Sequence, residues 1–267
     1  MKITFIGGGA MGEAMLSAVL GKGLTTVQET CISDVSDTRR NHLAQKYRVA
    51  VTENNRQAVN QSDIVVLAVK PQNLTEPMTE ISDQLKPEQL VLSIIAGARL
   101  ETLCQGLNHR SVVRVMPNTP AQIGEGMSVW TATSEVTTTQ KERTGSILSA
   151  MGREIYVDEE KYLDMATAVS GSGPAYFFLF IESLVESAMD IGLTREVAAE
   201  LVLQTMLGSA HLLRKSGKPP SELRRLVTSP GGTTAAAMLQ FEKGGLTNLV
   251  KQAVSAAYHR SRELAGN

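Results

Sequence analysis

The first half of the chain alternates short apolar runs, rich in β-branched residues, with stretches of helical length. The fourth and fifth runs are apolar throughout, which is typical of strands covered on both faces. This alternation predicts parallel strands joined by helical crossovers, and so an open, doubly wound α/β sheet. The runs are residues 3–6, 31–33, 49–51, 64–69, 90–95 and 112–115, and residues 126–131 and 153–157 are expected to add two edge strands.

Strand patterns stop after residue 157, and long helical patterns punctuated by glycine and proline follow. We therefore expect two domains, an α/β domain over residues 1–157 and an all-helical domain over residues 158–267. Expected helices of the second domain cover residues 162–191, 194–215, 221–227, 234–243 and 246–265.

Composition excludes several classes of function. The chain has 26 Lys and Arg against 27 Asp and Glu, without the basic clusters that nucleic acid needs. The longest uninterrupted apolar run, residues 175–181, is far shorter than the roughly 20 residues of a membrane-spanning helix. Two cysteines, Cys31 and Cys104, and four scattered histidines show no metal-ligand spacing, so we expect no metal site. No signal peptide pattern is present, and a cytoplasmic protein is expected.

The helical pattern over residues 175–185 is apolar on nearly every side. Such a helix must be buried, and a domain of 110 residues offers little material to cover it. We therefore expect a second copy of the chain to supply the cover, the alternative being an unusually well-wrapped internal helix.

The sequence GGGAMG, residues 7–12, follows the first predicted strand and opens a helix. It contains the pattern G-x-G-x-x-G, which in this context favours a dinucleotide-binding Rossmann domain over a turn without a ligand. The turn brings backbone amides and a helix N-terminus to the phosphates. The expected contacts are Gly7, Gly9, Ala10, Met11 and Gly12.

Asp34 lies 22 residues beyond Gly12, where NAD enzymes keep an acidic residue for the ribose. By that rule the chain prefers NAD. A 2′-phosphate nevertheless has candidate contacts nearby, so the choice between NADPH and NADH stays open at this point. These candidates are Ser33, Ser36, Arg39, Arg40 and Asn55.

Two further segments follow the fourth and fifth predicted strands. Ligands of open parallel sheets bind outside the carboxyl ends of strands, so these segments are expected to line the nicotinamide half of the site, although ordinary loop punctuation is the alternative. The residues are Ala68, Val69, Lys70, Pro71, Ala96 and Gly97.

The sequence SPGGTT, residues 229–234, precedes a predicted helix. Exposed backbone amides and a threonine hydroxyl at a helix start suit a small carboxylate, although a capped helix with a flexible lead-in has the same pattern. No hydrolase triad or nucleotide-triphosphate loop is present, which leaves redox chemistry.

Five motifs together resemble the pyrroline-5-carboxylate reductase family over essentially the whole chain. They are residues 3–12, AVKP at 68–71, MPNTP at 116–120, VSGSGPAY at 169–176 and residues 229–234. The resemblance implies NAD(P)H-dependent reduction of 1-pyrroline-5-carboxylate to L-proline, the last step of proline biosynthesis, by a homodimer or larger homo-oligomer with an all-helical dimerisation domain.

The resemblance also implies roles in substrate binding. The segment from Gly231 to Thr234 would hold the substrate carboxylate, and the Thr234 hydroxyl would bond the ring nitrogen, orienting it first and donating a proton second. Glu160 would help to hold the cationic imine, the alternative being an exposed residue at a helix start. The substrate-binding set is Glu160, Ser229, Gly231, Gly232, Thr233 and Thr234, with Thr234 as the catalytic residue.

Two departures from the family matter, Arg225 where relatives often carry an acidic residue, and Asp34 where a non-acidic residue is common. The departure at Asp34 keeps the choice between NADPH and NADH open. NADPH, which the family usually favours, is the expected cofactor, with NADH an alternative. A β-hydroxyacid dehydrogenase would need a lysine that the segment after Gly173 lacks. A non-catalytic NADPH-binding sensor would have no use for the carboxylate cradle.

Overall fold

The computed structural model describes residues 1–266 and divides them into two compact units. The first unit contains Met1–Ser172 and also the segment from Ala257 onwards, and the second contains Gly173–Ala256. This division differs from the expected boundary after residue 157. The reason lies in the packing: residues after 157 contact strands of the sheet, and Ser261 returns to bond Asp164. Each unit is described by itself below.

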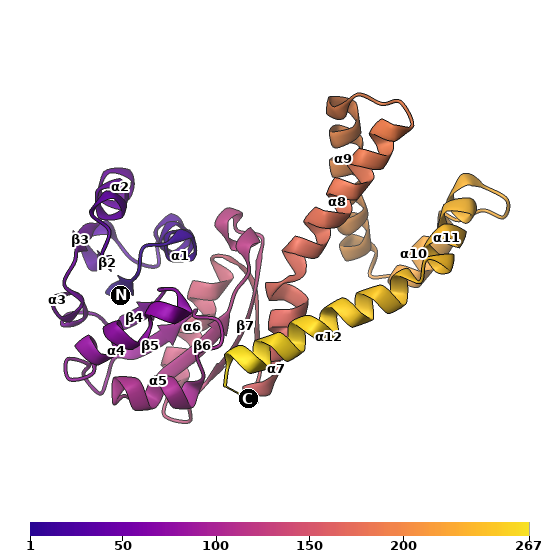
Figure 1. Cartoon of the computed structure of the whole chain (residues 1–267). Helices are drawn as coiled ribbons and strands as arrows, with labels where there is room; N and C mark the ends of the chain where they lie inside the picture. The colour runs from indigo at the N-terminus through magenta and orange to yellow at the C-terminus, as the bar shows by residue number, and fades with distance from the viewer. Residues whose placement is uncertain (267) are drawn as a thin grey trace. The chain divides into compact units, whose positions relative to one another are not determined.

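An eight-stranded sheet forms the first unit, in the order β3-β2-β1-β4-β5-β6-β7-β8 (Figure 1). All neighbouring strands are parallel except β6 and β7, so the predicted doubly wound, mostly parallel sheet is confirmed. Only β8 of the two expected edge strands lies at an edge, because β7 is between β6 and β8. The strands are β1 Ile3–Ile6, β2 Thr30–Ser33, β3 Ala50–Thr52, β4 Ile64–Leu67, β5 Leu90–Ser93, β6 Val112–Met116, β7 Gly126–Ala132 and β8 Gly152–Tyr156.

Helices cover both faces of the sheet, as period-two side-chain alternation requires. Phe5 faces a core shared with helices α1, α2 and α6, whereas its neighbour Ile6 faces a core shared with α3, α4 and α5. The chain order reverses between β1 and β4, which makes their carboxyl ends the switch point where such sheets bind ligands. The helices are α1 Ala10–Gly21, α2 Asp37–Tyr47, α3 Asn55–Val59, α4 Thr75–Ile81, α5 Leu100–Leu107 and α6 Thr138–Ser149, with short 3-10 turns η1 Val27–Glu29, η2 Pro71–Asn73 and η3 Thr119–Ile123.

The second unit is helical throughout, as expected. Thr194 caps α9 by accepting a hydrogen bond from the backbone of Val197, and α8 packs against α9. The last turns of α12, from Ala257, belong to the first unit. The helices are α8 Gly173–Asp190, α9 Arg195–Ser216, α10 Pro220–Leu226, α11 Thr233–Lys243 and α12 Leu246–Leu264.

The segment predicted as one helix over residues 162–191 is interrupted. Helix α7, Lys161–Ala166, runs into a π-helical turn, Thr167–Gly171, before α8 begins. The backbone of Ser172 donates to the carbonyl of Thr167 at 2.8 Å, the five-residue spacing of a π turn. A Cβ on Gly171 would lie 2.6 Å from the Met116 side chain, so the missing side chain lets this turn approach the end of β6.

The same stretch, Lys161–Asp190, is long and apolar enough by length and composition to cross a membrane. Only 17% of its most apolar window is buried within the chain. The expectation based on uninterrupted apolar runs therefore missed the overall hydropathy of this segment, whose apolar residues are separated by small and hydroxyl residues.

Candidate active site

The glycine-rich turn between β1 and α1 is closely packed at Gly7, Gly8 and Gly12 and open at Gly9. A Cβ on Gly7, whose φ is +99°, would lie 2.7 Å from the carbonyl oxygen of Ala68. A Cβ on Gly12 would lie 2.5 Å from the carbonyl oxygen of Gly7. A Cβ on Gly9 would meet nothing within 4 Å. The turn thus leaves open space at the N-terminus of α1, where backbone amides bind phosphate.

The other predicted cofactor residues follow the carboxyl ends of parallel strands on the same side of the sheet as this turn. The backbone of Ala68 donates to the carbonyl of Ile6 at 2.8 Å, so the segment after β4 lies beside the end of β1. Strand β4 ends at Leu67, earlier than predicted, which releases the following residues from the sheet. Residues at these strand ends include Gly7, Gly9, Ala10, Met11, Gly12, Ser33, Asp34, Asn55, Ala68, Val69, Lys70, Pro71, Ala96 and Gly97.

Asp34 and Asn55, two expected nucleotide contacts after β2 and β3, already have hydrogen-bond partners within the protein. Asp34 Oδ2 accepts a hydrogen bond from the backbone of Gly8 at 2.7 Å, and Oδ1 accepts one from Ser36 at 2.8 Å. Asn55 Nδ2 donates to Glu80 at 2.6 Å. The buried Ser33 Oγ has no hydrogen-bond partner among the described residues. With the open space at Gly9, these strand ends fit the phosphates and ribose of a dinucleotide.

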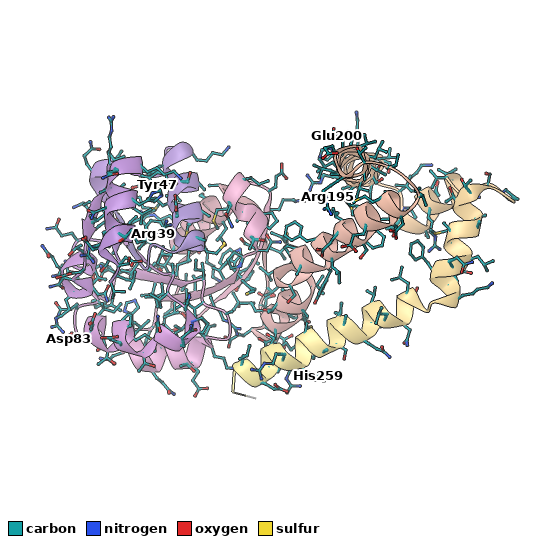
Figure 2. The ribbon with its side chains drawn as sticks, turned by 45° about the horizontal axis from the view of Figure 1, so that its top comes forward. Arg39, Tyr47, Asp83, Arg195, Glu200 and His259 are labelled. Atoms are coloured by element: carbon teal, nitrogen blue, oxygen red, sulfur yellow. The ribbon has the colours of Figure 1, made fainter. Side chains whose placement is uncertain are left out.

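A basic cluster surrounds Glu13 on α1 and borders a cavity of about 580 Å³ next to Gly9. Glu13 accepts hydrogen bonds from Lys46 at 2.8 Å, from Tyr47 at 2.9 Å and from Arg39. His42 lies 3.5 Å away. Figure 2 shows Arg39 and Tyr47 among the helices of the first unit.

The three hydrogen bonds determine the charge state of Glu13. Burial alone would raise the pKa of this carboxyl, but bonds from Lys46, Tyr47 and Arg39 outweigh burial and lower it to about 2. Sequence reasoning missed Glu13, although the spacing of residues 39, 42 and 46 indicates one basic face of a helix.

Glu160 belongs to a buried ion-pair network rather than standing free. Its carboxylate accepts from Arg114 Nη1 at 2.7 Å and from the backbone of Leu100 at 2.8 Å. Arg114 also pairs with Asp164 at 3.3 Å, and the side chains of Arg114 and Asp164 are only 3% and 5% exposed. Ser261 donates to Asp164 at 3.3 Å. This network connects β6, α7, the start of α5 and the end of α12.

The predicted carboxylate cradle lies in the second unit at the start of α11. Gly231 has a φ of +70°, and a Cβ on Gly232 would lie 2.6 Å from Ser229 Oγ. Gly232 is the N-cap residue of α11 and has no side chain to cap the helix. Thr233 and Thr234 begin that helix, so their backbone amides lie at its N-terminus, where anions are favoured.

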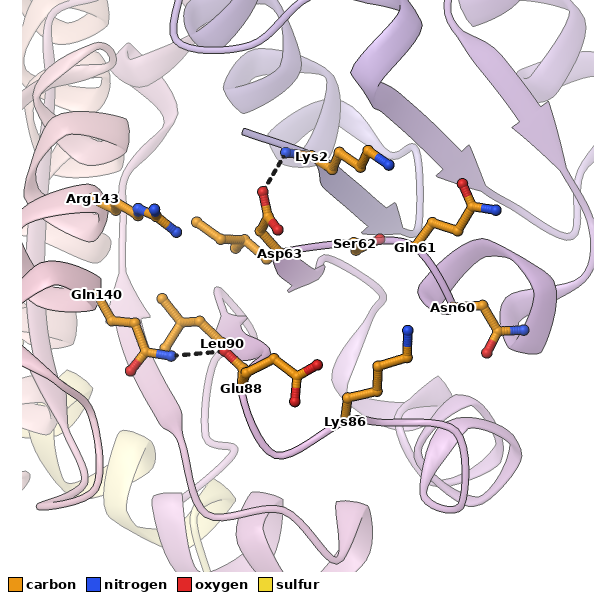
Figure 3. Close-up of a pocket in the computed structure, with 11 residues that line it drawn as sticks. Lys2, Asn60, Gln61, Ser62, Asp63, Lys86, Glu88, Leu90, Gln140 and Arg143 are labelled. Atoms are coloured by element: carbon orange, nitrogen blue, oxygen red, sulfur yellow. Dashed lines mark hydrogen bonds between the residues drawn. The ribbon is translucent and has the colours of Figure 1, made fainter.

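A second cavity, of about 410 Å³, lies near the amino ends of β1, β4 and β5 (Figure 3). Lys2 donates from its backbone to Asp63 at 2.8 Å, and Gln140 donates to the carbonyl of Glu88 at 3.2 Å. These residues lie near the amino ends of the strands, so they are not part of the dinucleotide site. Within residues 1–266 no three potential metal ligands of the His, Cys, Asp or Glu type come together.

Comparisons with known proteins match both halves of the chain. Residues 160–264 match the family model "Pyrroline-5-carboxylate reductase dimerisation", and residues 2–97 match "NADP oxidoreductase coenzyme F420-dependent". A pyrroline-5-carboxylate reductase of Pseudomonas aeruginosa is 43% identical over 99% of this chain and 97% of its own length. The chain belongs to the pyrroline-5-carboxylate reductase family.

Solved structures of other family members agree. A pyrroline-5-carboxylate reductase of Coxiella burnetii superposes with a TM-score of 0.91 at 36% identity, covering 99% of this chain and 98% of the other. A Plasmodium falciparum family member, solved with NADP bound, gives a TM-score of 0.90 at 32% identity and the same coverage. The family assignment therefore rests on the full length of both units.

Proposed function

We propose that this protein transfers hydride from NADPH to the imine carbon of 1-pyrroline-5-carboxylate and so forms L-proline, in the cytoplasm. The observation that carries the proposal is the open space at Gly9, at the N-terminus of α1 where backbone amides can bind phosphate. The chain that contains it matches a reductase of this family over 99% of its length. NADPH supplies the hydride when bound. The chain's own residues bind and orient the two reactants, and orientation is the main source of rate acceleration for such a reaction.

The substrate is a small cyclic imine with a carboxylate. We assign the carboxylate to the amides of Gly231, Gly232 and Thr233, with Ser229 bracing the turn beneath Gly232. Thr234 then bonds the ring nitrogen. Hydride addition to the protonated imine leaves a neutral amine, to which the Thr234 hydroxyl can donate a proton, although an ordinary hydroxyl is a weak acid. This chemistry needs no strongly acidic side chain, because the protonated imine is already electrophilic.

Glu160 has a different part in this proposal from the one that the sequence indicated. Its carboxylate is bound to Arg114 and to the start of α5. Any attraction for a cationic imine would come from a network already partly neutralised by Arg114. We therefore assign Glu160 to holding the loop after β5, which carries Ala96 and Gly97, and to the substrate only through that loop.

Turnover of 1-pyrroline-5-carboxylate with NADPH and NADH, measured side by side by loss of nicotinamide absorbance, tests the proposal. We expect reduction with both, with the larger kcat/KM for NADPH. Proline-driven reduction of the oxidised cofactors at high pH provides the reverse reaction. Absence of turnover with both cofactors in both directions would overturn the proposed function.

We further propose that a second copy of the chain covers the apolar face of α8. Phe177, Phe178 and Leu179 are 61–64% exposed within one chain. Exposed aromatic surface of this size marks an interaction site, and the segment falls in the region matched by the dimerisation model. A self-complementary pair of such helices gives the two-fold assembly most common in soluble enzymes.

A further inference from the structure

The peptide groups of the glycine-rich turn are held by the segment that joins β2 to α2. The backbone of Gly7 donates to the carbonyl of Ser33 at 2.7 Å, and that of Gly8 donates to Asp34 Oδ2 at 2.7 Å. Arg39 Nε donates to the carbonyl of Gly8. Both polar groups of Gly8 are therefore occupied by side chains from one neighbouring segment.

Packing leaves Gly8 little freedom to move. A Cβ at this position would lie 2.5 Å from the Leu43 side chain and 3.3 Å from that of Ile32. Leu43 belongs to α2 and is fully buried. Helix α2, which carries Arg39, therefore also packs closely against Gly8 through Leu43.

Arg39 is itself held in place by an ion pair with Glu13. One terminal nitrogen of its guanidinium donates to Glu13 Oε2, while Lys46 and Tyr47 bind the other carboxylate oxygen. Because the pKa of Glu13 lies near 2, this anchor stays charged across the physiological range.

We propose that Asp34 and Arg39 are positioning residues that hold the glycine-rich turn in place for the pyrophosphate, with Arg39 itself held by Glu13. They do not discriminate between NADPH and NADH. The inference rests on the dinucleotide site of the proposed function. The spacing of Asp34 is that of a ribose-binding acid, but both its oxygens accept backbone N–H groups. Arg39 would be an obvious partner for a 2′-phosphate, but it holds Gly8 and Glu13 instead.

This arrangement resolves a conflict between Asp34 and NADPH. A free carboxylate beside the ribose would repel a 2′-phosphate. A carboxylate that accepts two backbone N–H groups, on a segment flanked by Arg39 and Arg40, repels it much less. Arg40 Nη1 donates to the carbonyl of Asp34 at 2.8 Å and so adds positive charge close to that carboxylate.

Equilibrium binding of the two cofactors separates positioning from discrimination without requiring turnover. The fluorescence of NADPH and NADH is titrated with the wild-type protein, with Arg39→Gln and with Arg39→Lys. We expect Arg39→Gln to raise both dissociation constants by about tenfold and to leave their ratio unchanged within about twofold. Arg39→Lys should behave similarly, because an ammonium group cannot hold Gly8 and Glu13 with the geometry of a guanidinium.

Lys46→Gln is the matched control, because Lys46 also pairs with Glu13 but makes no contact with Gly8. It removes the same charge from the same cluster and should change both dissociation constants less than threefold. A loss confined to NADPH, full rescue by Arg39→Lys, or an equal effect of Lys46→Gln would overturn the proposal.

Asp34→Asn gives an independent test if Arg39→Gln fails to fold, as judged by thermal unfolding of the ligand-free protein. Positioning predicts weaker binding of both cofactors, because a neutral amide accepts the Gly8 N–H less strongly. A discriminating role predicts tighter binding of NADPH alone, which would contradict us. A wild-type protein that binds neither cofactor would instead overturn the proposed function.

Discussion

At the scale of single residues, Glu13 stabilises the first unit through three hydrogen bonds from two basic side chains and a phenol. Its pKa is about 2 in the folded protein against an ordinary value of 4.5. A carboxyl with a lowered pKa contributes stability above its unfolded pKa, and this contribution is lost as the pH falls towards the folded value.

Glu13→Gln should therefore lower the free energy of unfolding by about 1–2 kcal/mol at pH 7. Chemical denaturation of both proteins between pH 7 and pH 3 measures the difference. The difference in unfolding free energy should be constant above about pH 5 and should become smaller below about pH 4.5. A difference that stayed constant down to pH 3 would show that the charge of Glu13 is not the stabilising feature.

Thr234 tests the substrate half of the site. Thr234→Ala should reduce kcat/KM for 1-pyrroline-5-carboxylate by about tenfold to a hundredfold, because the ring nitrogen loses its orienting hydroxyl. Thr234→Ser keeps the hydroxyl and should retain most activity. Steady-state kinetics at saturating NADPH provide the measurement, and an unchanged kcat and KM for Thr234→Ala would remove the residue from the mechanism.

Glu160 shows why a residue's position in the sequence does not reveal its partners. Glu160→Gln should destabilise the protein by about 1–3 kcal/mol, since Arg114 is buried and loses a charged partner. Thermal unfolding of the ligand-free protein detects this loss. An unchanged melting temperature combined with a raised KM for the substrate would instead favour direct substrate contact.

Sequence spacing identified Asp34 and Arg39 as residues near the nucleotide, but not the atoms they bind. Gly8, which both hold, was the one glycine of the turn without an expected role. The distance from Asp34 to Gly8 depends on how β2 lies beside β1, and no local pattern encodes it. Glu13 was missed for the same reason, since its partners are 26 to 34 residues away.

At the scale of elements, the strands were predictable because each is a short apolar run with both faces buried. The antiparallel direction of β7 was not, because side-chain pattern reports which faces of a strand are buried, and β7 is mostly buried on both faces like the parallel strands. The π turn over Thr167–Gly171 also escaped prediction, because its residues continue the helical pattern on both sides.

The turn from β1 to α1 offers a prediction that separates packing from binding. Gly12→Ala should destabilise the protein by about 1–3 kcal/mol, because the new methyl group meets the carbonyl of Gly7. Gly9→Ala has room for its methyl group and should leave stability unchanged while weakening NADPH binding at least tenfold. Thermal unfolding and cofactor titration of both variants measure the two effects.

A result in which Gly9→Ala bound NADPH as tightly as the wild type would place the pyrophosphate elsewhere. Equal destabilisation by both substitutions would contradict the difference in packing between the two glycines. The open space at Gly9 is therefore tested independently of catalysis.

At the scale of the whole molecule, α8 predicts association between copies of the chain. Phe178→Lys should weaken the assembly by placing a charge in an apolar contact, so the mass measured by light scattering should fall with dilution far more readily than for the wild type. Ile123→Lys, at an exposed apolar residue of the first unit, is the control and should leave the mass unchanged. A wild-type protein that is monomeric at micromolar concentration would contradict the proposal.

The all-helical nature of the second half was predictable from its periodicity. That its last turns pack with the first unit was not predictable. Residues from Ala257 continue the pattern of α12 and yet pack with the first unit. Two contacts hold these residues there. Ser261 donates to Asp164, and the carbonyl oxygen of Leu264 lies 3.2 Å from the position of a Cβ on Gly97. Helical periodicity shows which face is apolar, but not which partner covers it.

The return of residues 257–266 has a consequence for synthesis. The first unit is assembled from two pieces of chain separated by α8 to α11 and the first turns of α12. While the ribosome is still translating those helices, the sheet can form but the loop at Gly97 lacks its neighbour. The contact between Gly97 and Leu264 therefore forms only after the whole helical unit has been synthesised.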